Sequence, residues 1–139
     1  MKKLSMFSLF LFLFVMAAGT ISYAQNEPVL YFCERYDSDD GEIGVADRFT
    51  TGYLTVMVKC DRALKLEDVS VQFDKWDAYT GKFKYYKKFD YTIERDMSYV
   101  FFTKNDESDM SFDEPGFYRV FLLDDDGETV ASSLVQIIE

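Results

Sequence analysis

Apolar and polar residues alternate along several short segments of the chain. The segments 53–60 and 69–74 show this alternation clearly, and a period of two is typical of a β-strand with one face on a core. The apolar phases are Leu54, Val56, Val58 and Cys60 in the first segment and Val69, Val71 and Phe73 in the second. No apolar set recurs at spacings of three and four over a dozen residues, so the pattern predicts an all-β protein.

Seven segments rich in aromatic and β-branched residues are predicted strands. They are 29–36, 53–60, 69–78, 82–93, 97–103, 117–123 and 129–138. Turn-forming residues separate them, including Thr80-Gly81 and Asp126-Gly127. Seven short strands within residues 25–139 predict one domain, folded as a seven-stranded antiparallel two-sheet sandwich.

The third and fourth predicted strands form a hairpin whose register follows from the turn at 79–81. If Gly81 closes a three-residue loop, paired residue numbers sum to 160 and apolar partners share one face. The pairs are then Val69 with Tyr91, Val71 with Phe89, Asp74 with Tyr86, and Trp76 with Lys84. In this register Trp76 and Tyr86 point away from the core. A bulge that turns Trp76 inward is the alternative.

The segment 113–120 reads Asp-Glu-Pro-Gly-Phe-Tyr-Arg-Val. It resembles the start of the sixth strand in bacterial immunoglobulin-like and fibronectin type III-like domains, where a tyrosine closes a corner. The resemblance implies an immunoglobulin-like fold and structural roles for Pro115, Gly116 and Tyr118. Both phases of the strand 117–123 are mainly apolar, which predicts that this strand is covered on both faces.

The first 24 residues have the pattern of a signal peptide. Lys2 and Lys3 precede an apolar stretch from 4 to 18, and Ser22-Tyr23-Ala24 offers a cleavage site. Cleavage after Ala24 predicts a periplasmic or secreted protein with no membrane insertion after cleavage. An uncleaved anchor is the alternative, although the stretch is shorter than the roughly 20 residues that span a bilayer.

The chain is acidic, with 15 Lys and Arg against 25 Asp and Glu and a formal net charge of −10. Such a surface repels phosphate backbones, so nucleic acid is not an expected partner. Cys33 and Cys60 lie in a chain predicted to be exported, where an oxidising compartment permits a disulfide between them. Two buried unpaired thiols are the alternative.

The sequence offers little for catalysis. It has no histidine, the commonest general base, and no serine in a Gly-x-Ser-x-Gly elbow, so we predict no enzymatic activity and no cofactor. The acidic segment 37–42 is a weak candidate for a calcium loop, because its oxygen ligands depart from EF-hand spacing, and a solvated turn is the alternative. The residues concerned are Asp37, Asp39, Asp40 and Glu42.

Exposed aromatic side chains on a rigid hairpin indicate a binding surface, because they bury much area and lose little entropy on binding. We therefore predict an exported, non-catalytic binding or protein-interaction module with a protein or glycan partner in the cell envelope or outside the cell. The predicted contact residues are Trp76, Tyr79, Lys84 and Tyr86. A carbohydrate-binding module that uses the same aromatic hairpin face is the alternative.

Overall fold

The computed structural model describes residues 27–105 and 108–139, and the predicted signal peptide lies outside these ranges. Every regular element in the described ranges is a β-strand, so the predicted all-β class is confirmed. No helix in this part of the chain has the length and apolar character needed to cross a membrane.

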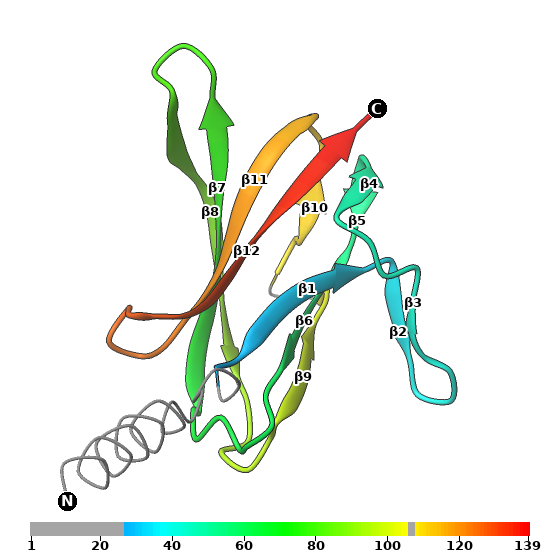
Figure 1. Ribbon diagram of the computed structural model, residues 1–139, viewed down its shortest axis with the longest axis vertical. Coiled ribbons are helices and arrows are strands. Elements are labelled where there is room, and N and C mark those ends of the chain that lie inside the picture. Colours follow the sequence, from blue (N-terminus) through cyan, green and yellow to red (C-terminus); the bar gives the residue numbers. More distant parts are fainter. Residues whose placement is uncertain (1–26, 106–107) are drawn as a thin grey trace, which may run out of the picture.

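Two larger sheets and two strand pairs make up the fold (Figure 1). The five-stranded sheet has the order β4 (Arg48–Thr50), β12 (Thr129–Ile138), β11 (Gly116–Leu123), β7 (Asp68–Asp77) and β8 (Lys82–Thr92). The three-stranded sheet has the order β1 (Val29–Cys33), β6 (Thr55–Lys59) and β9 (Tyr99–Phe102). The pairs are β2 (Arg35–Asp37) with β3 (Gly41–Ile43), and β5 (Gly52–Tyr53) with β10 (Ser111–Phe112).

The seven predicted strands correspond to β1, β6, β7, β8, β9, β11 and β12, and the structure adds five short ones. The segment 29–36 is divided into β1 and β2, and the segment 53–60 into β5 and β6. The sheets are not purely antiparallel, because β4 runs parallel to β12. The added strands have two or three residues each, too few to show an alternating pattern in the sequence.

Inward-facing residues of both larger sheets form one core cluster. Their alternation is the one that the sequence predicts, since a strand directs every second side chain to the same face. From the five-stranded sheet the cluster includes Val69, Val71, Phe73, Tyr118, Val120 and Leu122, and from the three-stranded sheet Leu30, Phe32, Val56, Val58 and Phe102.

A corner before β11 fixes the start of this strand. The buried Tyr118 hydroxyl donates a hydrogen bond to the Glu114 carbonyl oxygen at 2.7 Å, as the corner motif predicts. Burial raises the pKa of Tyr118 well above its usual range, so the hydroxyl stays protonated. Gly116 has φ +152°, and an added Cβ would lie 3.1 Å from the Lys75 side chain, which explains glycine after Pro115.

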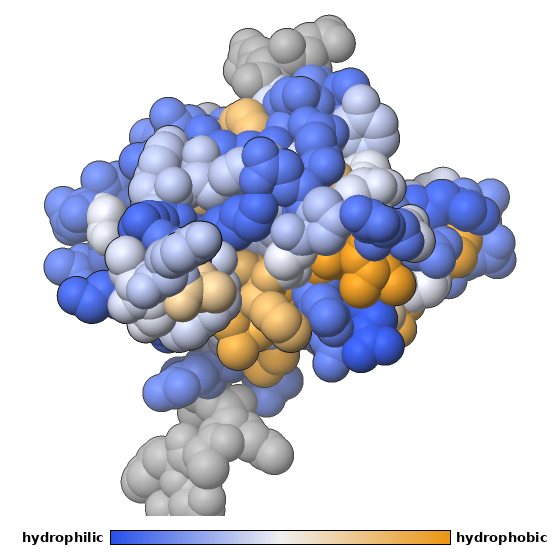
Figure 2. Space-filling view, turned by 90° about the horizontal axis from the view of Figure 1, so that it is seen from above, coloured by the Kyte–Doolittle hydropathy of each residue, from blue (hydrophilic) through white to orange (hydrophobic). Residues whose placement is uncertain are grey.

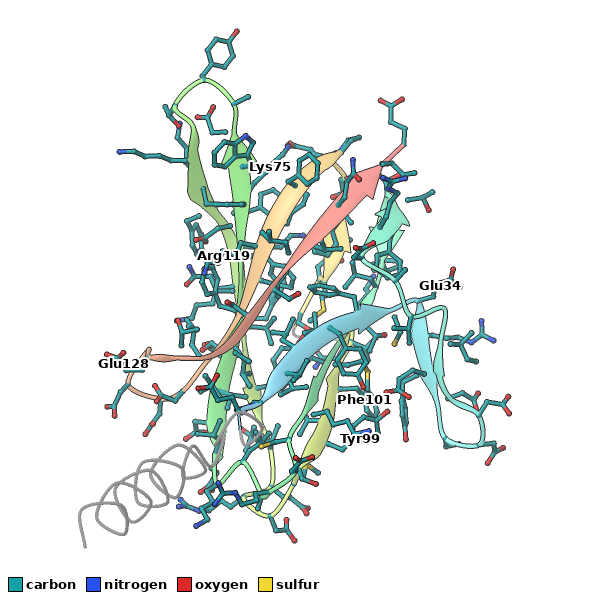
Figure 3. All side chains as sticks on the ribbon, viewed as in Figure 1. Glu34, Lys75, Tyr99, Phe101, Arg119 and Glu128 are labelled. Carbon is teal, nitrogen blue, oxygen red and sulfur yellow. The ribbon has the colours of Figure 1, made fainter. Side chains whose placement is uncertain are left out.

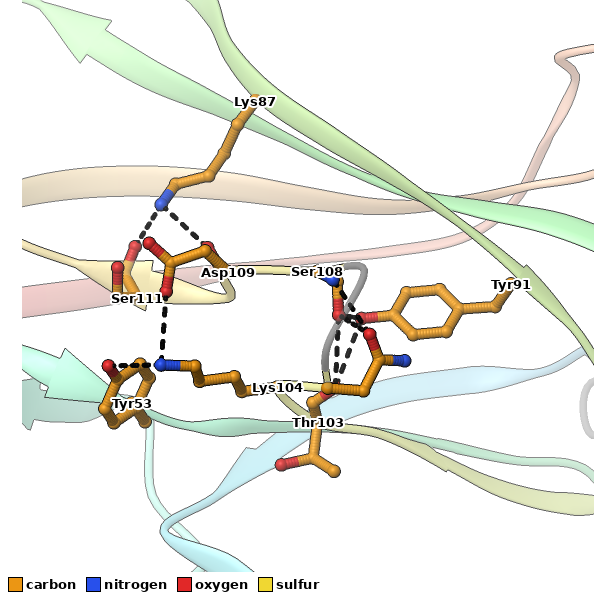
Figure 4. Close-up of polar contacts among 9 residues, drawn as sticks. Tyr53, Lys87, Tyr91, Thr103, Lys104, Ser108, Asp109 and Ser111 are labelled. Carbon is orange, nitrogen blue, oxygen red and sulfur yellow. Dashed lines mark hydrogen bonds and ion pairs between the residues drawn. The ribbon is translucent and has the colours of Figure 1, made fainter.

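One edge between the larger sheets is closed by polar contacts of residues 103–105 and 108–112 (Figure 4). Lys87 of β8 donates to the carbonyl oxygens of Asp109 and Ser111. The Tyr91 hydroxyl, also on β8, donates to Ser108 Oγ at 2.8 Å. These bonds connect the edge of the five-stranded sheet to the chain that follows β9, so the two sheets are held together along this side.

Candidate interaction surface

The outer face of the five-stranded sheet carries large apolar side chains that no described part of the chain covers. It lies opposite the core face, and its members follow from the alternation along β7, β8, β11 and β12. We call this surface the open face and define it by Trp76, Phe83, Tyr85, Phe117, Arg119, Phe121, Leu134 and Ile138.

The exposure of the open face is high for residues of this kind. Phe117 is 51% exposed, Leu134 55%, Tyr85 66% and Trp76 41%. Figure 2 shows apolar residues gathered at the upper end of the molecule, between hydrophilic margins. Contiguous exposed apolar residues on a soluble protein usually mark a contact surface.

The strand β11 corrects one prediction. Both of its phases were predicted to be covered, but only the Tyr118 phase is buried. Phe117 is half-exposed and Phe121 is partly exposed on the other phase. An apolar phase in a strand can be covered by the same chain or left for a partner, and the sequence pattern does not distinguish these cases.

A bulge in β8 decides which hairpin aromatics reach the open face. The predicted register holds for Val69 with Tyr91 and Val71 with Phe89, and it shifts by one residue beyond Phe73. Trp76 therefore pairs with Phe83, and the predicted pairs of Asp74 with Tyr86 and Trp76 with Lys84 are wrong. The observed partner of Asp74 is Tyr85. The bulge inserts an extra residue into β8, so the side chains before it point to the opposite face from the one that the predicted register gives.

The bulge turns Tyr86 toward the core. Its ring lies 5.3 Å from that of Tyr118, edge to face, and burial raises the pKa of its hydroxyl. The prediction that Tyr86 points outward is therefore wrong, whereas Trp76 does point outward. Trp76 packs edge to face on Phe83, with 5.1 Å between the ring centroids and 64° between the planes.

The other two predicted contact residues lie off the open face. Tyr79 is fully exposed at the tip of the β7–β8 hairpin, which extends beyond the neighbouring strands (Figure 1). Lys84 lies on the opposite side of the hairpin from Trp76 and forms an ion pair with Asp77. This ammonium, together with the Tyr79 backbone N–H, lowers the pKa of the Asp77 carboxyl to about 2. Lys84 therefore pairs with a carboxyl of its own hairpin.

Arg119 lies at the centre of the open face. It belongs to β11, the middle strand of the five, and pairs with Leu134 of β12 and Asp74 of β7. Its guanidinium carbon is 5.0 Å from the centroid of the Phe121 ring. Figure 3 shows its place on the five-stranded sheet, away from Tyr99 and Phe101 of β9.

The outer face of the three-stranded sheet differs, because the β2–β3 hairpin covers it. We call it the covered face. Tyr36 of β2 stacks on Phe101, with 4.4 Å between the ring centroids and 17° between the planes. Figure 3 shows Tyr99 and Phe101 on β9, next to this hairpin. The covered face consists of Tyr31, Cys33, Thr55, Met57, Tyr99 and Phe101, of which Cys33, Thr55 and Met57 are buried and Phe101 is 45% exposed.

Two of the four calcium candidates, Asp37 and Glu42, accept hydrogen bonds at this hairpin. Asp37 accepts hydrogen bonds from the backbone N–H groups of Asp39 and Asp40 in the turn. Glu42 accepts hydrogen bonds from the hydroxyls of Tyr31 and Tyr99, and both bonds lower the pKa of its carboxyl. In the described residues, no group of three or more Asp, Glu, Cys or His side chains is arranged to hold a metal ion.

The predicted disulfide is wrong, because Cys33 and Cys60 lie far apart. Cys33 pairs with Thr55, and Cys60 is five residues beyond Thr55 along the same chain segment. Five residues of extended chain span about 17 Å, whereas a disulfide requires Cα atoms within about 7 Å. Cys33 is buried on the covered face, and burial raises the pKa of its thiol.

An acidic groove of about 910 Å³ lies beside the β11–β12 turn. Two of its carboxylates have structural hydrogen bonds: Asp124 accepts from two backbone N–H groups of the turn, and Asp90 accepts from the Ser70 hydroxyl. These bonds explain Asp124 as part of the turn and Asp90 as part of a strand pair.

Trp76 was correctly predicted to point outward, but most other residues of the open face were not predicted. Phe83 and Tyr85 were not predicted because the bulge has no signal in the sequence. Phe117, Leu134 and Ile138 were not predicted because an exposed apolar phase has the same sequence pattern as a covered one. Comparisons of the chain with protein-family models, with curated proteins and with solved structures found no match.

Proposed function

We propose that the protein is an exported, non-catalytic module of the cell envelope that binds a protein partner through the open face. The proposal takes its fold to be an immunoglobulin-like sandwich and its first 24 residues to be a cleaved signal peptide. The observation that carries it is the exposure of Phe117, Leu134 and Tyr85 on one rigid sheet face. Large apolar and aromatic residues at the centre of a surface provide most of the binding energy in protein interfaces.

The geometry favours a protein partner over a glycan. A sugar-binding platform needs coplanar exposed rings, but Trp76 and Phe83 are inclined by 64° and Tyr86 is turned toward the core. The open face also extends over four adjacent strands, β8, β7, β11 and β12. Such a broad sheet face suits the surface of a folded partner better than a single sugar chain.

A photo-crosslinking experiment in the exporting cells tests this proposal. A photoreactive phenylalanine derivative is placed at position 134, and in a matched control at Glu128, which is exposed in the β11–β12 turn away from the open face (Figure 3). We expect a discrete protein adduct from position 134 only, and its loss when Phe117→Ser is added. Equal adduct yields from both positions, or an adduct yield that Phe117→Ser does not reduce, would refute the proposal.

A further inference from the structure

Arg119 is a cation at the centre of the open face. Phe117 and Phe121 lie two residues before and after it on the same side of β11, and Leu134 lies opposite it on β12. Arginine at the centre of an aromatic patch is a typical composition of an interface hot spot.

The guanidinium of Arg119 keeps its hydrogen-bonding capacity for a partner. Within residues 27–105 and 108–139 no ion pair or side-chain hydrogen bond is formed by this group. Asp74, its cross-strand neighbour, instead accepts a hydrogen bond from the Gln72 amide at 2.9 Å. Stacking on Phe121 holds the guanidinium against the sheet, and its planar fork suits a carboxylate.

A purely apolar partner would desolvate this charge without compensation, which costs more than the apolar contacts of one side chain supply. A partner that covers Phe117 and Leu134 must therefore bring an acceptor to Arg119. The net charge of −10 repels broadly acidic partners, so a single carboxylate within an apolar surface fits better than an acidic stretch.

We infer that the open face recognises a protein segment that presents one Asp or Glu carboxylate flanked by apolar side chains. The carboxylate pairs with the Arg119 fork, and the flanking side chains pack on Phe117, Leu134 and Trp76. This inference rests on the proposed function and adds the chemistry of the partner. The source is a protein, because the apolar residues of β12, β11 and β7 extend over about 10 Å of sheet, wider than an acyl chain.

The test uses a random twelve-residue peptide library displayed on phage, selected on the wild-type protein and on Arg119→Met. The Met side chain keeps apolar bulk and removes the charge. We expect peptides from the wild type to carry one acidic residue between apolar ones, and those from the variant to lack this enrichment. Recovered peptides are then synthesised with Glu and with Gln at the acidic position, and binding is followed by the emission of Trp76, the only tryptophan in the chain.

The Glu peptides should bind the wild type roughly 10- to 100-fold more tightly than the Gln peptides, and Arg119→Met should remove this difference. Asp74→Asn is the matched control and should retain the difference. If binders depend on Phe117 and Leu134 but show no acidic preference, the inference fails and the proposed function stands. If no binder depends on these two residues, both fail. A dimer in sedimentation that Leu134→Ser abolishes would assign the face to a second copy and also overturn the inference.

Discussion

The two outer faces of this molecule contain similar residues and differ in what covers them. On the covered face, Met57 is fully buried and Phe101 stacks under Tyr36 of the β2–β3 hairpin. On the open face, Phe117 and Leu134 remain more than half exposed. The β2–β3 hairpin thus covers part of one outer sheet face, where Phe101 stays 45% exposed, and no described segment covers the other.

An apolar strand face that its own chain leaves uncovered marks a contact surface in an all-β protein. A strand with two apolar phases is most stable when other residues cover both of its faces, because exposed apolar area costs about 25 cal/mol per Å² relative to burial. The short hairpin 35–43 meets part of this need for the three-stranded sheet, where Met57 is fully buried and Tyr36 stacks on Phe101. Nothing in the described chain meets it for the five-stranded sheet, which is why we assign the open face to a partner.

The largest expected effect comes from Met57→Ala on the covered face. Because Met57 is fully buried, we expect a loss of about 2 to 5 kcal/mol in the free energy of unfolding, measured by urea titration. Leu134→Ala on the open face is the matched change and should alter stability by less than about 0.5 kcal/mol. Equal losses would mean that Leu134 is covered in solution.

Tyr36→Ala should have a smaller effect, because it removes the stack on Phe101 but leaves the sheet intact. We expect a loss of about 1 to 2 kcal/mol and faster amide hydrogen exchange in residues 35–43. Unchanged exchange in this hairpin would show that the stack does not hold it to the sheet.

Trp76→Ala removes the corresponding aromatic pair from the open face. Since Trp76 is 41% exposed and its ring packs edge to face on Phe83, we expect less than about 1 kcal/mol of destabilisation. Binding of the selected peptides should weaken by a larger factor than stability changes. A stability loss of several kcal/mol with unchanged peptide binding would assign Trp76 to the core instead.

The smallest effect is a pH dependence of the hairpin that covers the three-stranded sheet. Hydrogen bonds from Tyr31 and Tyr99 lower the pKa of Glu42 below its usual value of 4.5. Its contribution is therefore complete above that value and is lost as the pH falls through the lowered pKa. Amide exchange of residues 35–43 should accelerate in this acidic range.

Glu42→Gln is the control for the pH prediction, because the amide oxygen still accepts a hydrogen bond but does not titrate. The acceleration at low pH should be reduced in this variant relative to the wild type. An identical pH response in both proteins would exclude Glu42 as its origin.

Much of the fold was predictable from local pattern. The alternation in β6, β7 and β11 identified the core phases, and the segment 113–120 indicated a corner that the Tyr118 hydroxyl closes. These features depend on residues near one another in the chain, and so the sequence carries them directly.

Other features depend on contacts between distant segments. The bulge that turns Tyr86 inward, the separation of Cys33 from Cys60, and the folding of residues 35–43 over Met57 all follow from how the strands assemble. No local pattern encodes them, which is why the predicted pairs of Trp76 with Lys84 and Cys33 with Cys60 were wrong.

The all-β class, the positions of the seven main strands and the corner at Tyr118 follow from the sequence, because period-two alternation and turn residues act locally. Which apolar phase is covered depends on contacts between segments that are distant in the chain. Met57 and Phe117 both lie on the outward phase of a strand, and they differ in whether another part of the chain covers them: Met57 is fully buried, whereas Phe117 is 51% exposed. The protein therefore has a covered face and an open face, and the open face is the proposed binding surface centred on Arg119.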